Sequence, residues 1–192
     1  MIESNILDFF AKYVTLDAES ISSFLAVFHK INLEKNDYLL TEGQVAEGIY
    51  MITKGCTKGF YEKDGKEIIV GFGFENDIIT SYYSFISRKP SFENIQALED
   101  TELWGIKYED VQILYEKHHH ISELGRKLAE KYYLEMAERS IILQNWTAKE
   151  RYNYFFKTKP QALQRISLKQ IASYLAITPE HLSRIRAEKD IS

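Results

Sequence analysis

The 192-residue sequence predicts an α+β protein, in which an antiparallel β-barrel precedes a long helix and a C-terminal helical domain. Two changes of pattern carry this prediction. Apolar residues recur at helical spacing before residue 30 and after residue 107, and they form short β-type runs between these positions. A third observation is a pair of short, capped helices within residues 165–186. The expected domains are residues 1–117, 118–145 and 146–192.

Two helices are expected at the start of the chain, over residues 2–13 and 19–29. Their apolar positions recur three or four residues apart, at Ile6, Phe9, Phe10 and Tyr13 and then at Ile21, Phe24, Leu25 and Phe28. This spacing gives each helix one apolar face that can pack on a neighbouring domain.

Short β-type runs separated by turn residues follow from residue 30 to about residue 106. They cover residues 37–40, 48–52, 57–61, 67–72, 94–98 and 102–106. Residues 63–66 are expected to form a hairpin turn, because the pair Asp64-Gly65 tolerates the positive φ angles of such a turn. The regular spacing of the runs predicts an antiparallel barrel or sandwich.

A helix is expected over residues 108–145, and from Ile121 onward it is long. One apolar stripe consists of Ile121, Leu124, Leu128, Tyr132 and Ile142, and a second of Tyr133, Leu134, Ala137 and Ile141. A helix with two stripes needs two partners. The seam of a homodimer is assigned to Ile121, Leu124, Leu128 and Tyr132, and the second stripe to packing on the chain's own domains. Burial of both stripes within a monomer is the alternative.

Residues 165–186 predict a helix-turn-helix. Ser167 and Gln170 have the spacing of a capping box, while Thr178 followed by Pro179 supplies an N-cap hydroxyl and then a proline at the first helical position. The inner faces consist of Ile171, Ala172, Leu175, Leu182 and Ile185. Polar side chains occupy the other faces of the second helix, which suits a helix lying in the major groove of DNA. The alternative is a helical hairpin that packs for stability alone.

The charge of the chain is unevenly divided. Residues 145–192 contain nine Lys or Arg against four Asp or Glu, whereas residues 1–144 contain fifteen against twenty-four. A basic C-terminal region in an acidic chain favours contact with nucleic acid through that region. Candidates for phosphate contacts are Lys149, Arg151, Lys157, Lys159, Arg165 and Lys169, with a solvated face as the alternative.

Other kinds of site lack the residues they need. No arrangement of catalytic residues and no glycine-rich phosphate loop stands out, so no enzyme activity is expected. Adjacent side chains at His118, His119 and His120 point about 100° apart on a helix, which favours a solvated helix start over a metal site. The single Cys56 cannot hold an iron–sulfur cluster and is expected to be a buried strand residue, so no cofactor is expected.

Membrane and export signals are also missing from the sequence. No apolar stretch approaches the roughly 18 residues that span a bilayer, and the N-terminus has no signal-peptide pattern. A cytoplasmic protein without a membrane partner is expected.

Five segments at characteristic spacing suggest a relationship: Leu39-Leu-Thr-Glu-Gly43, residues 49–55, residues 97–106, residues 171–175 and residues 182–185. Together with the order of elements, they resemble the Crp/Fnr family of bacterial transcription regulators. The resemblance implies a jelly-roll of the cyclic-nucleotide-binding type, a central dimerisation helix and a C-terminal winged helix, whose wing would have to come from residues 161–166. The partners it implies are duplex DNA, a second copy of the chain, an unidentified small-molecule effector and RNA polymerase.

The resemblance also exposes departures at the effector site. The family's Gly-Glu pair for ribose falls on Thr80-Ser81, and its Arg-Ser pair for the cyclic phosphate falls on Ser91-Phe92. Neither pair is kept, so cyclic AMP is not the expected effector; the nearest cations are Arg88 and Lys89. The effector pocket is assigned to Ser81, Tyr82, Arg88, Ser91 and Phe92.

The family's DNA-reading residues can be carried over by position. A Glu near the start of the recognition helix and an Arg four residues later fall on Glu180 and Arg184, whereas Pro179 stands where an arginine often reads guanine. DNA contacts are assigned to Lys169, Thr178, Glu180, His181, Ser183, Arg184 and Arg186. His181 and Ser183 have solvated or phosphate-facing positions as alternatives. The predicted function is sequence-specific DNA-binding regulation; the alternative is a small-molecule-binding or protein-interaction module without DNA binding.

Overall fold

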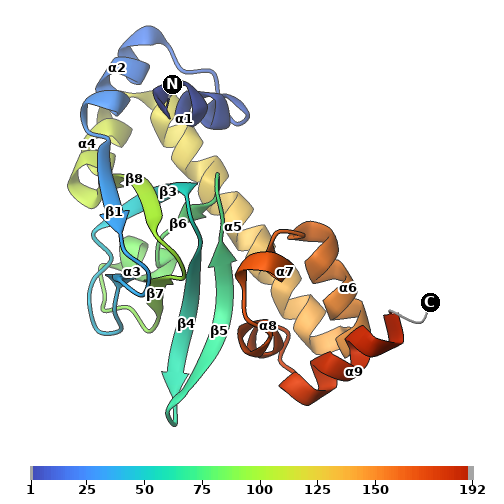
Figure 1. The fold of residues 1–192 in the computed structure, drawn as a ribbon. Helices are drawn as coiled ribbons and strands as arrows, with labels where there is room; N and C mark the ends of the chain where they lie inside the picture. The colour runs from blue at the N-terminus through green and yellow to red at the C-terminus, as the bar shows by residue number, and fades with distance from the viewer. Residues whose placement is uncertain (1, 190–192) are drawn as a thin grey trace.

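The computed structural model describes residues 2–189, and a long helix links its β-sheets to a helical module (Figure 1). The chain opens with α1 (Ile2–Ala11) and α2 (Ala18–Ala26). The Asp17 side chain starts α2 by accepting a hydrogen bond from the backbone N–H of Ser20. Both predicted opening helices form with shorter bounds, and α2 ends before residue 29 because the chain enters an unpredicted strand, β1 (His29–Leu33).

Two four-stranded antiparallel sheets follow, with the strand orders β1-β8-β3-β6 and β2-β7-β4-β5. The remaining strands are β2 (Tyr38–Leu40), β3 (Gly48–Lys54), β4 (Thr57–Lys63), β5 (Lys66–Gly73), β6 (Ile78–Ile79), β7 (Asn94–Ala97) and β8 (Thr101–Lys107). All six predicted runs form strands, and the short β6 and helix α3 (Tyr82–Ser87) were not predicted. The β4–β5 hairpin turns at Asp64 and Gly65, which have φ angles of 53° and 70°.

The region predicted as one helix is divided into α4 (Tyr108–Lys117) and α5 (His119–Asn145). His118 lies at the break and is buried, with Nδ1 3.3 Å from the hydroxyl of Ser20 in α2. The expected solvated helix start therefore holds for His119 and His120 but is wrong for His118.

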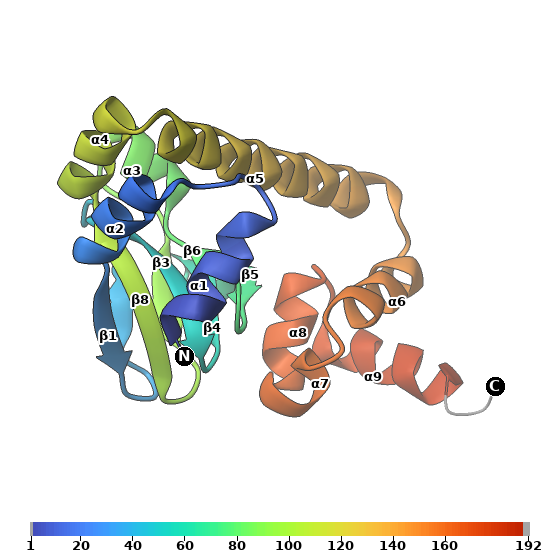
Figure 2. The same cartoon turned by 90° about the horizontal axis from the view of Figure 1, so that it is seen from above.

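The first half of α5 is covered by the chain's own helices α1, α2 and α4, which lie together at one end of the sheets (Figure 2). Leu124 is 2% exposed and joins Ile121 in the core, and Leu128 packs against the same cluster. Tyr132 stacks on Tyr82 with the ring centroids 4.1 Å apart. Ile121 and Leu124 are buried within the monomer, so their assignment to a dimer seam is wrong, whereas Leu128 and Tyr132 are half-buried and their place in a seam stays a prediction.

The second stripe of α5 is the exposed one. Tyr133, Leu134 and Ile141 are exposed, and Ala137 between them is half-buried. The stripe expected to pack on the chain's own domains is thus available to another molecule, because α1, α2 and α4 lie against the opposite side of the helix.

The C-terminal module consists of α6 (Ala148–Thr158), α7 (Ala162–Arg165), α8 (Leu168–Tyr174) and α9 (Pro179–Lys189). Trp146 separates α5 from α6, and its ring lies 5.4 Å from that of Tyr154. No strand forms in the described part of this module, residues 146–189, and α7 occupies the segment expected to supply a wing. The expectation of a wing at residues 161–166 is therefore wrong.

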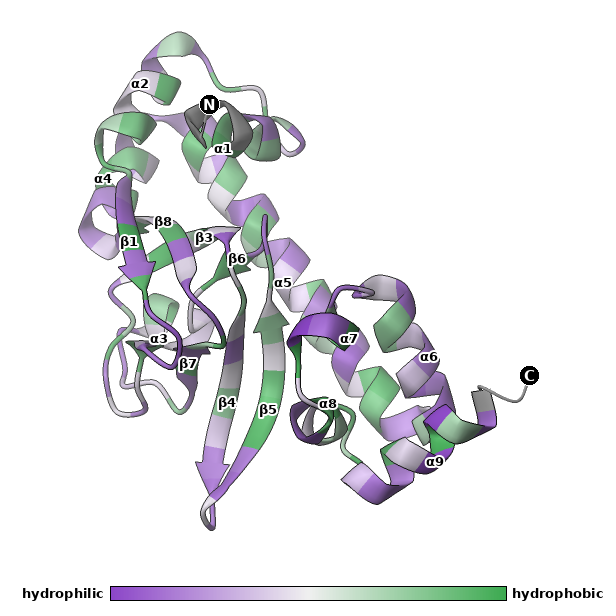
Figure 3. Ribbon diagram, in the orientation of Figure 1, coloured by the Kyte–Doolittle hydropathy of each residue, from purple (hydrophilic) through white to green (hydrophobic). Residues whose placement is uncertain are grey.

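A second core joins this module to the β-sheet. Phe60, Ile69 and Phe72 from the sheet belong to the same buried cluster as Phe155 and Leu182 from the helices. The hydrophobic middle of β5 lies beside α7 and α8 (Figure 3). The buried Cys56 belongs to this cluster, in the turn between β3 and β4 rather than in a strand as expected; burial raises the pKa of its thiol to about 12.

Within residues 2–189, every helix is too short or too polar to cross a lipid bilayer.

Candidate functional site

Helices α8 and α9 form the predicted helix-turn-helix. Ser167 and Gln170 make the reciprocal capping box, and the backbone N–H of His181 donates to the Thr178 hydroxyl at 3.2 Å. Ala176 in the turn has a φ of 53°, a left-handed conformation that redirects the chain between the helices. All five predicted inner residues, Ile171, Ala172, Leu175, Leu182 and Ile185, are buried.

The outer face of α9 carries polar side chains at helical spacing. Glu180, Ser183 and Arg184 are exposed and lie three or four positions apart, so they share one face. Hydrogen bonds from its own backbone N–H and from the Thr178 hydroxyl hold the pKa of Glu180 below its usual range, and the charge of Arg184 adds to this effect. The face therefore presents a fixed carboxylate beside a guanidinium, a combination that suits base-edge reading.

The other residues assigned to DNA have different surroundings. Thr178 is occupied as the cap of α9, while His181 and Arg186 are half-buried on its flanks. Lys169, in the first turn of α8, is exposed.

Four of the six basic residues considered for phosphate contacts are bonded within the protein. Arg151 donates to the carbonyl oxygens of Leu143 and Trp146, and Lys149 pairs with Glu188. Lys159 lies 3.4 Å from Asp77, and Arg165 bridges Glu75 and Glu99. Lys157 and Lys169 remain exposed. Arg165 and Lys159 bind the β-sheet, which makes them poor candidates for phosphate contacts.

Polar contacts reinforce the junction between β5 and the helical module. The Ser173 hydroxyl donates to the Glu67 carbonyl and accepts from the Ile69 N–H, both at 3.0 Å. Arg139 of α5 donates to the Ile69 and Tyr174 carbonyls, and its guanidinium lies 3.9 Å from the Tyr174 ring centroid. The helix-turn-helix is thus bonded to the edge strand β5.

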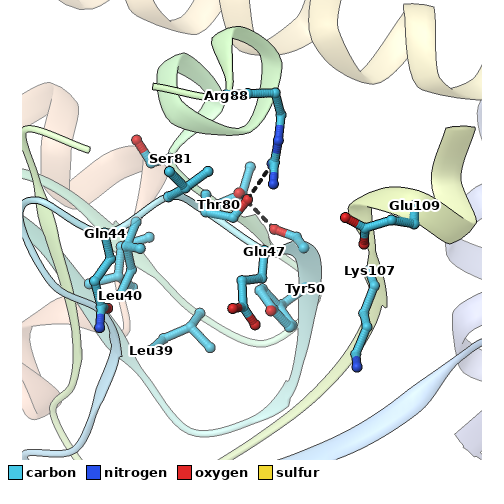
Figure 4. Close-up of a pocket in the computed structure, with 14 residues that line it drawn as sticks. Leu39, Leu40, Gln44, Glu47, Tyr50, Thr80, Ser81, Arg88, Lys107 and Glu109 are labelled. Atoms are coloured by element: carbon cyan, nitrogen blue, oxygen red, sulfur yellow. Dashed lines mark hydrogen bonds between the residues drawn. The ribbon is translucent and has the colours of Figure 1, made fainter. Parts of the chain in front are cut away.

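A first cavity of about 620 Å³ lies between the β2–β3 loop, α3 and the start of α4 (Figure 4). Ser81 and Arg88, two of the predicted pocket residues, line it. Arg88 donates to the Ala46 carbonyl at 2.7 Å and stacks 3.9 Å above the Tyr108 ring, so the fold uses its guanidinium. Thr80 is also occupied, donating to the Gly48 carbonyl at 2.8 Å.

A second cavity of about 430 Å³ lies between strands β4, β5 and β7, helix α5 and the helical module. Tyr82 lines it together with Tyr132. Ser91 is buried and does not line this cavity; its hydroxyl donates to the Glu93 carbonyl at 2.9 Å and lies 3.2 Å from the Ser81 hydroxyl. Phe92 is 62% exposed and packs on Tyr83 outside both cavities. The five predicted pocket residues are therefore not brought together in one site.

Glu93 lines the second cavity and was missed by the sequence reasoning. A Cβ built on Gly59 of β4 would lie 3.6 Å from Glu93 Oε2, so the carboxyl lies beside that glycine. Burial raises the pKa of Glu93, partly offset by a hydrogen bond from Ser81. Its position two residues after Ser91, where the family's phosphate pair begins, is the signal that could have revealed it.

Comparisons with known proteins agree with this architecture. Residues 30–118 match the family of cyclic nucleotide-binding domains. FixK2 from Bradyrhizobium japonicum has a TM-score of 0.69 and 20% identity, with 84% of each chain covered.

Two further solved structures align over most of the chain. The c-di-GMP responsive global regulator CLP from Xanthomonas campestris has a TM-score of 0.68 and 20% identity, covering 91% of this chain and 92% of CLP. A protein from Eubacterium rectale, described as a transcriptional regulator of the Crp/Fnr family, has a TM-score of 0.71 and 16% identity, covering 92% of this chain and 84% of its own. No curated protein matches the sequence. At these identities the likeness establishes a shared fold.

Proposed function

Since residues 30–118 are a domain of the cyclic nucleotide-binding type in a chain with the Crp/Fnr fold, we propose that the protein is a sequence-specific DNA-binding transcription regulator. The observation that carries this proposal is the exposed α9 face of Glu180, Ser183 and Arg184 on a fully capped helix-turn-helix. The protein acts in the cytoplasm as a homodimer, joined through the exposed α5 stripe of Tyr133, Leu134 and Ile141.

Strand β5 supports a route from an effector to the DNA-binding helices. Val70 and Gly71 line the second cavity, whereas Ile69 in the same strand bonds to Ser173 of α8. A ligand that displaces β5 would therefore change the position of the helix-turn-helix relative to the β-sheet.

Binding of random duplex DNA at varied salt tests the proposal. The affinity measured by fluorescence anisotropy should fall steeply as salt rises, because phosphate contacts release counterions. A protein that binds no duplex at low salt would instead be a ligand-binding or protein-interaction module.

Arg184→Ala and Lys169→Ala should have different effects on DNA recognition. Arg184 has the forked donors to bond guanine, so its loss should relax preference at one base pair in each half-site, by about 1–3 kcal/mol. Lys169 provides a point charge, so its loss should weaken all sequences alike and reduce the salt slope by about one unit. Selection from a randomised duplex library with each variant measures both effects. Uniform weakening by Arg184→Ala, with preference intact, would make Arg184 a backbone anchor.

Cyclic AMP is expected not to bind this protein saturably. Thr80-Ser81 and Ser91-Phe92 replace the two family pairs, and Ser91 is bonded within the protein. Among the described residues that line the second cavity, the two arginines are Arg139 and Arg151, and both guanidinium groups are hydrogen-bonded to backbone carbonyl oxygens. Neither is therefore free to bind a cyclic phosphate. Calorimetry at physiological nucleotide concentrations should show no binding isotherm, and a micromolar dissociation constant would contradict this expectation.

A further inference from the structure

The second cavity contains a carboxyl group that the fold leaves without a cation. Glu93 is half-buried there, and among residues 6–188 no lysine or arginine forms an ion pair with it. Burying a carboxylate without a cation is unfavourable, and proteins retain such groups mainly where a ligand uses them.

The basic residues that line this cavity are occupied elsewhere. Lys159 pairs with Asp77, and Lys131 lies 3.7 Å from Glu135. Arg139 and Arg151 donate to backbone carbonyl oxygens. The lining contains four acidic and four basic residues, and each of the basic groups is bonded to a partner other than Glu93, which leaves the Glu93 carboxyl available to a cation from a ligand.

Tyrosine side chains line the same cavity as the Glu93 carboxyl. Tyr61 of β4 and Tyr132 of α5 both have a pKa raised by burial first and then by the negative charge of Glu93. The Tyr132 ring stacks on Tyr82 of α3, so a tyrosine from each of three elements borders the same space. Electron-rich ring faces beside a carboxylate are the surroundings that attract organic cations.

We propose that the second cavity binds a small organic cation, a protonated amine or quaternary ammonium, whose charge pairs with Glu93 and whose alkyl groups lie against Tyr61, Tyr82 and Tyr132. This inference rests on the proposed function in one respect, since it names the class of effector that the sensor domain receives. The volume of the second cavity, about 430 Å³, lies within the usual range of small-molecule sites, about 300–1,000 Å³.

Titration calorimetry and thermal unfolding with n-butylammonium chloride test the proposal, with 1-butanol and sodium butyrate as neutral and anionic probes of matched length. Butylammonium should bind saturably and raise the unfolding temperature at constant ionic strength. The other two probes should not. Equal stabilisation by all three probes, or no saturable binding of butylammonium, would overturn the proposal.

Glu93→Gln provides the matched substitution, because it removes the charge and keeps the shape. Butylammonium binding should weaken at least tenfold, while the unliganded variant should unfold at the same temperature or higher because a buried charge has been removed. Glu109→Gln is the control, since Glu109 lines the first cavity, and it should leave butylammonium binding unchanged. Unchanged binding by Glu93→Gln would refute the assigned pairing.

A measurement on the unmodified protein keeps the proposal testable if Glu93→Gln does not fold. A bound cation favours the ionised carboxylate, so binding should release protons where Glu93 titrates. Calorimetry in two buffers of different ionisation enthalpy reads this release directly. The other titratable groups that line this cavity are Tyr61 on β4, Asp77 before β6, Tyr82 on α3, Lys131, Tyr132, Glu135, Glu138 and Arg139 on α5, Arg151 and Tyr154 on α6, Lys159 after α6, and Tyr174 on α8. Tyrosine, lysine and arginine titrate far from carboxyl groups, so Asp77→Asn, Glu135→Gln and Glu138→Gln separate the contributions of the other carboxyls. Absence of proton release would contradict the proposal.

Ligand binding and DNA binding are read separately in these experiments. Protein that binds duplex DNA but not butylammonium refutes the cation site and leaves the regulator function standing. Protein that binds butylammonium but no duplex DNA refutes the regulator function and leaves the cation site standing.

Discussion

Replacing Leu124 by aspartate should unfold the protein rather than separate two subunits. Leu124 is 2% exposed within the core that α5 shares with α1 and α4. The substitution removes a buried side chain and introduces an unpaired charge, so the free energy of unfolding should fall by about 4 kcal/mol or more. Urea denaturation followed by circular dichroism measures this loss.

Leu134→Asp is the matched control, since it makes the same chemical change ten positions further along α5, at a side chain that is 65% exposed. Monomer stability should change by less than about 0.5 kcal/mol, whereas sedimentation velocity should show dimers replaced by monomers. Comparing the variants at low protein concentration separates intrinsic stability from association. A Leu124→Asp variant that is stable and monomeric would show that the first stripe is the dimer seam. A Leu134→Asp variant that remains dimeric would show that the second stripe is not.

Arg165→Ala should weaken the attachment of the helical module to the β-sheet. The Arg165 guanidinium donates two bonds to Glu75, at 2.7 and 2.9 Å, and a third to Glu99, while its plane lies near the Phe74 ring. Its removal leaves two carboxylates without their common cation. Because 38% of the Glu75 side chain is exposed, solvent screening reduces the coupling energy between Arg165 and Glu75, which we expect to be about 1–2 kcal/mol.

A double-mutant cycle with Glu75→Gln measures this coupling, and hydrogen exchange in α7 and α8 measures the weakened attachment. Lys149→Ala is the control, because it breaks the exposed pair with Glu188 and leaves the sheet contact intact. Unaltered exchange in α7 and α8 of Arg165→Ala would show that the apolar core alone holds the module.

The same ion pair gives the stability a defined acid dependence. Hydrogen bonds from Arg165 lower the pKa of Glu75 from 4.5 to about 2. Because the folded value lies below the unfolded one, this contribution is complete above pH 4.5 and is lost as the pH falls toward 2. The fall in the urea midpoint over this interval should be smaller in Arg165→Ala than in the unmodified protein.

Elements specified by local chemistry could be predicted from the sequence. The capping box of Ser167 and Gln170 and the Asp64-Gly65 turn depend on residues within four positions of one another, and both form as expected. The periodicity of α5 correctly identified the residues that share a face.

What covers each face of α5 depends on distant parts of the chain. Leu124 shares a core with Phe10 of α1, which lies 114 positions earlier in the sequence, and periodicity contains no information about that contact. The placement of Arg165 is a similar case, because its acidic partners lie in the β-domain. Glu93 escaped notice because a single acidic residue becomes informative only when the fold encloses it and leaves it without a cation.

Trp146 stands at the junction where the long helix ends and the helical module begins, in ring contact with Tyr154. The second of the two tryptophans, Trp104, lies in β8 against Phe28, far along the chain from this junction. The indole of Trp146 is therefore an intrinsic fluorophore at this junction, and Phe substitution of Trp104 isolates its emission. A rotation of the helical module about residue 146 would change the solvation of that indole and shift its emission wavelength, so such a movement could be followed optically, in real time and without a label.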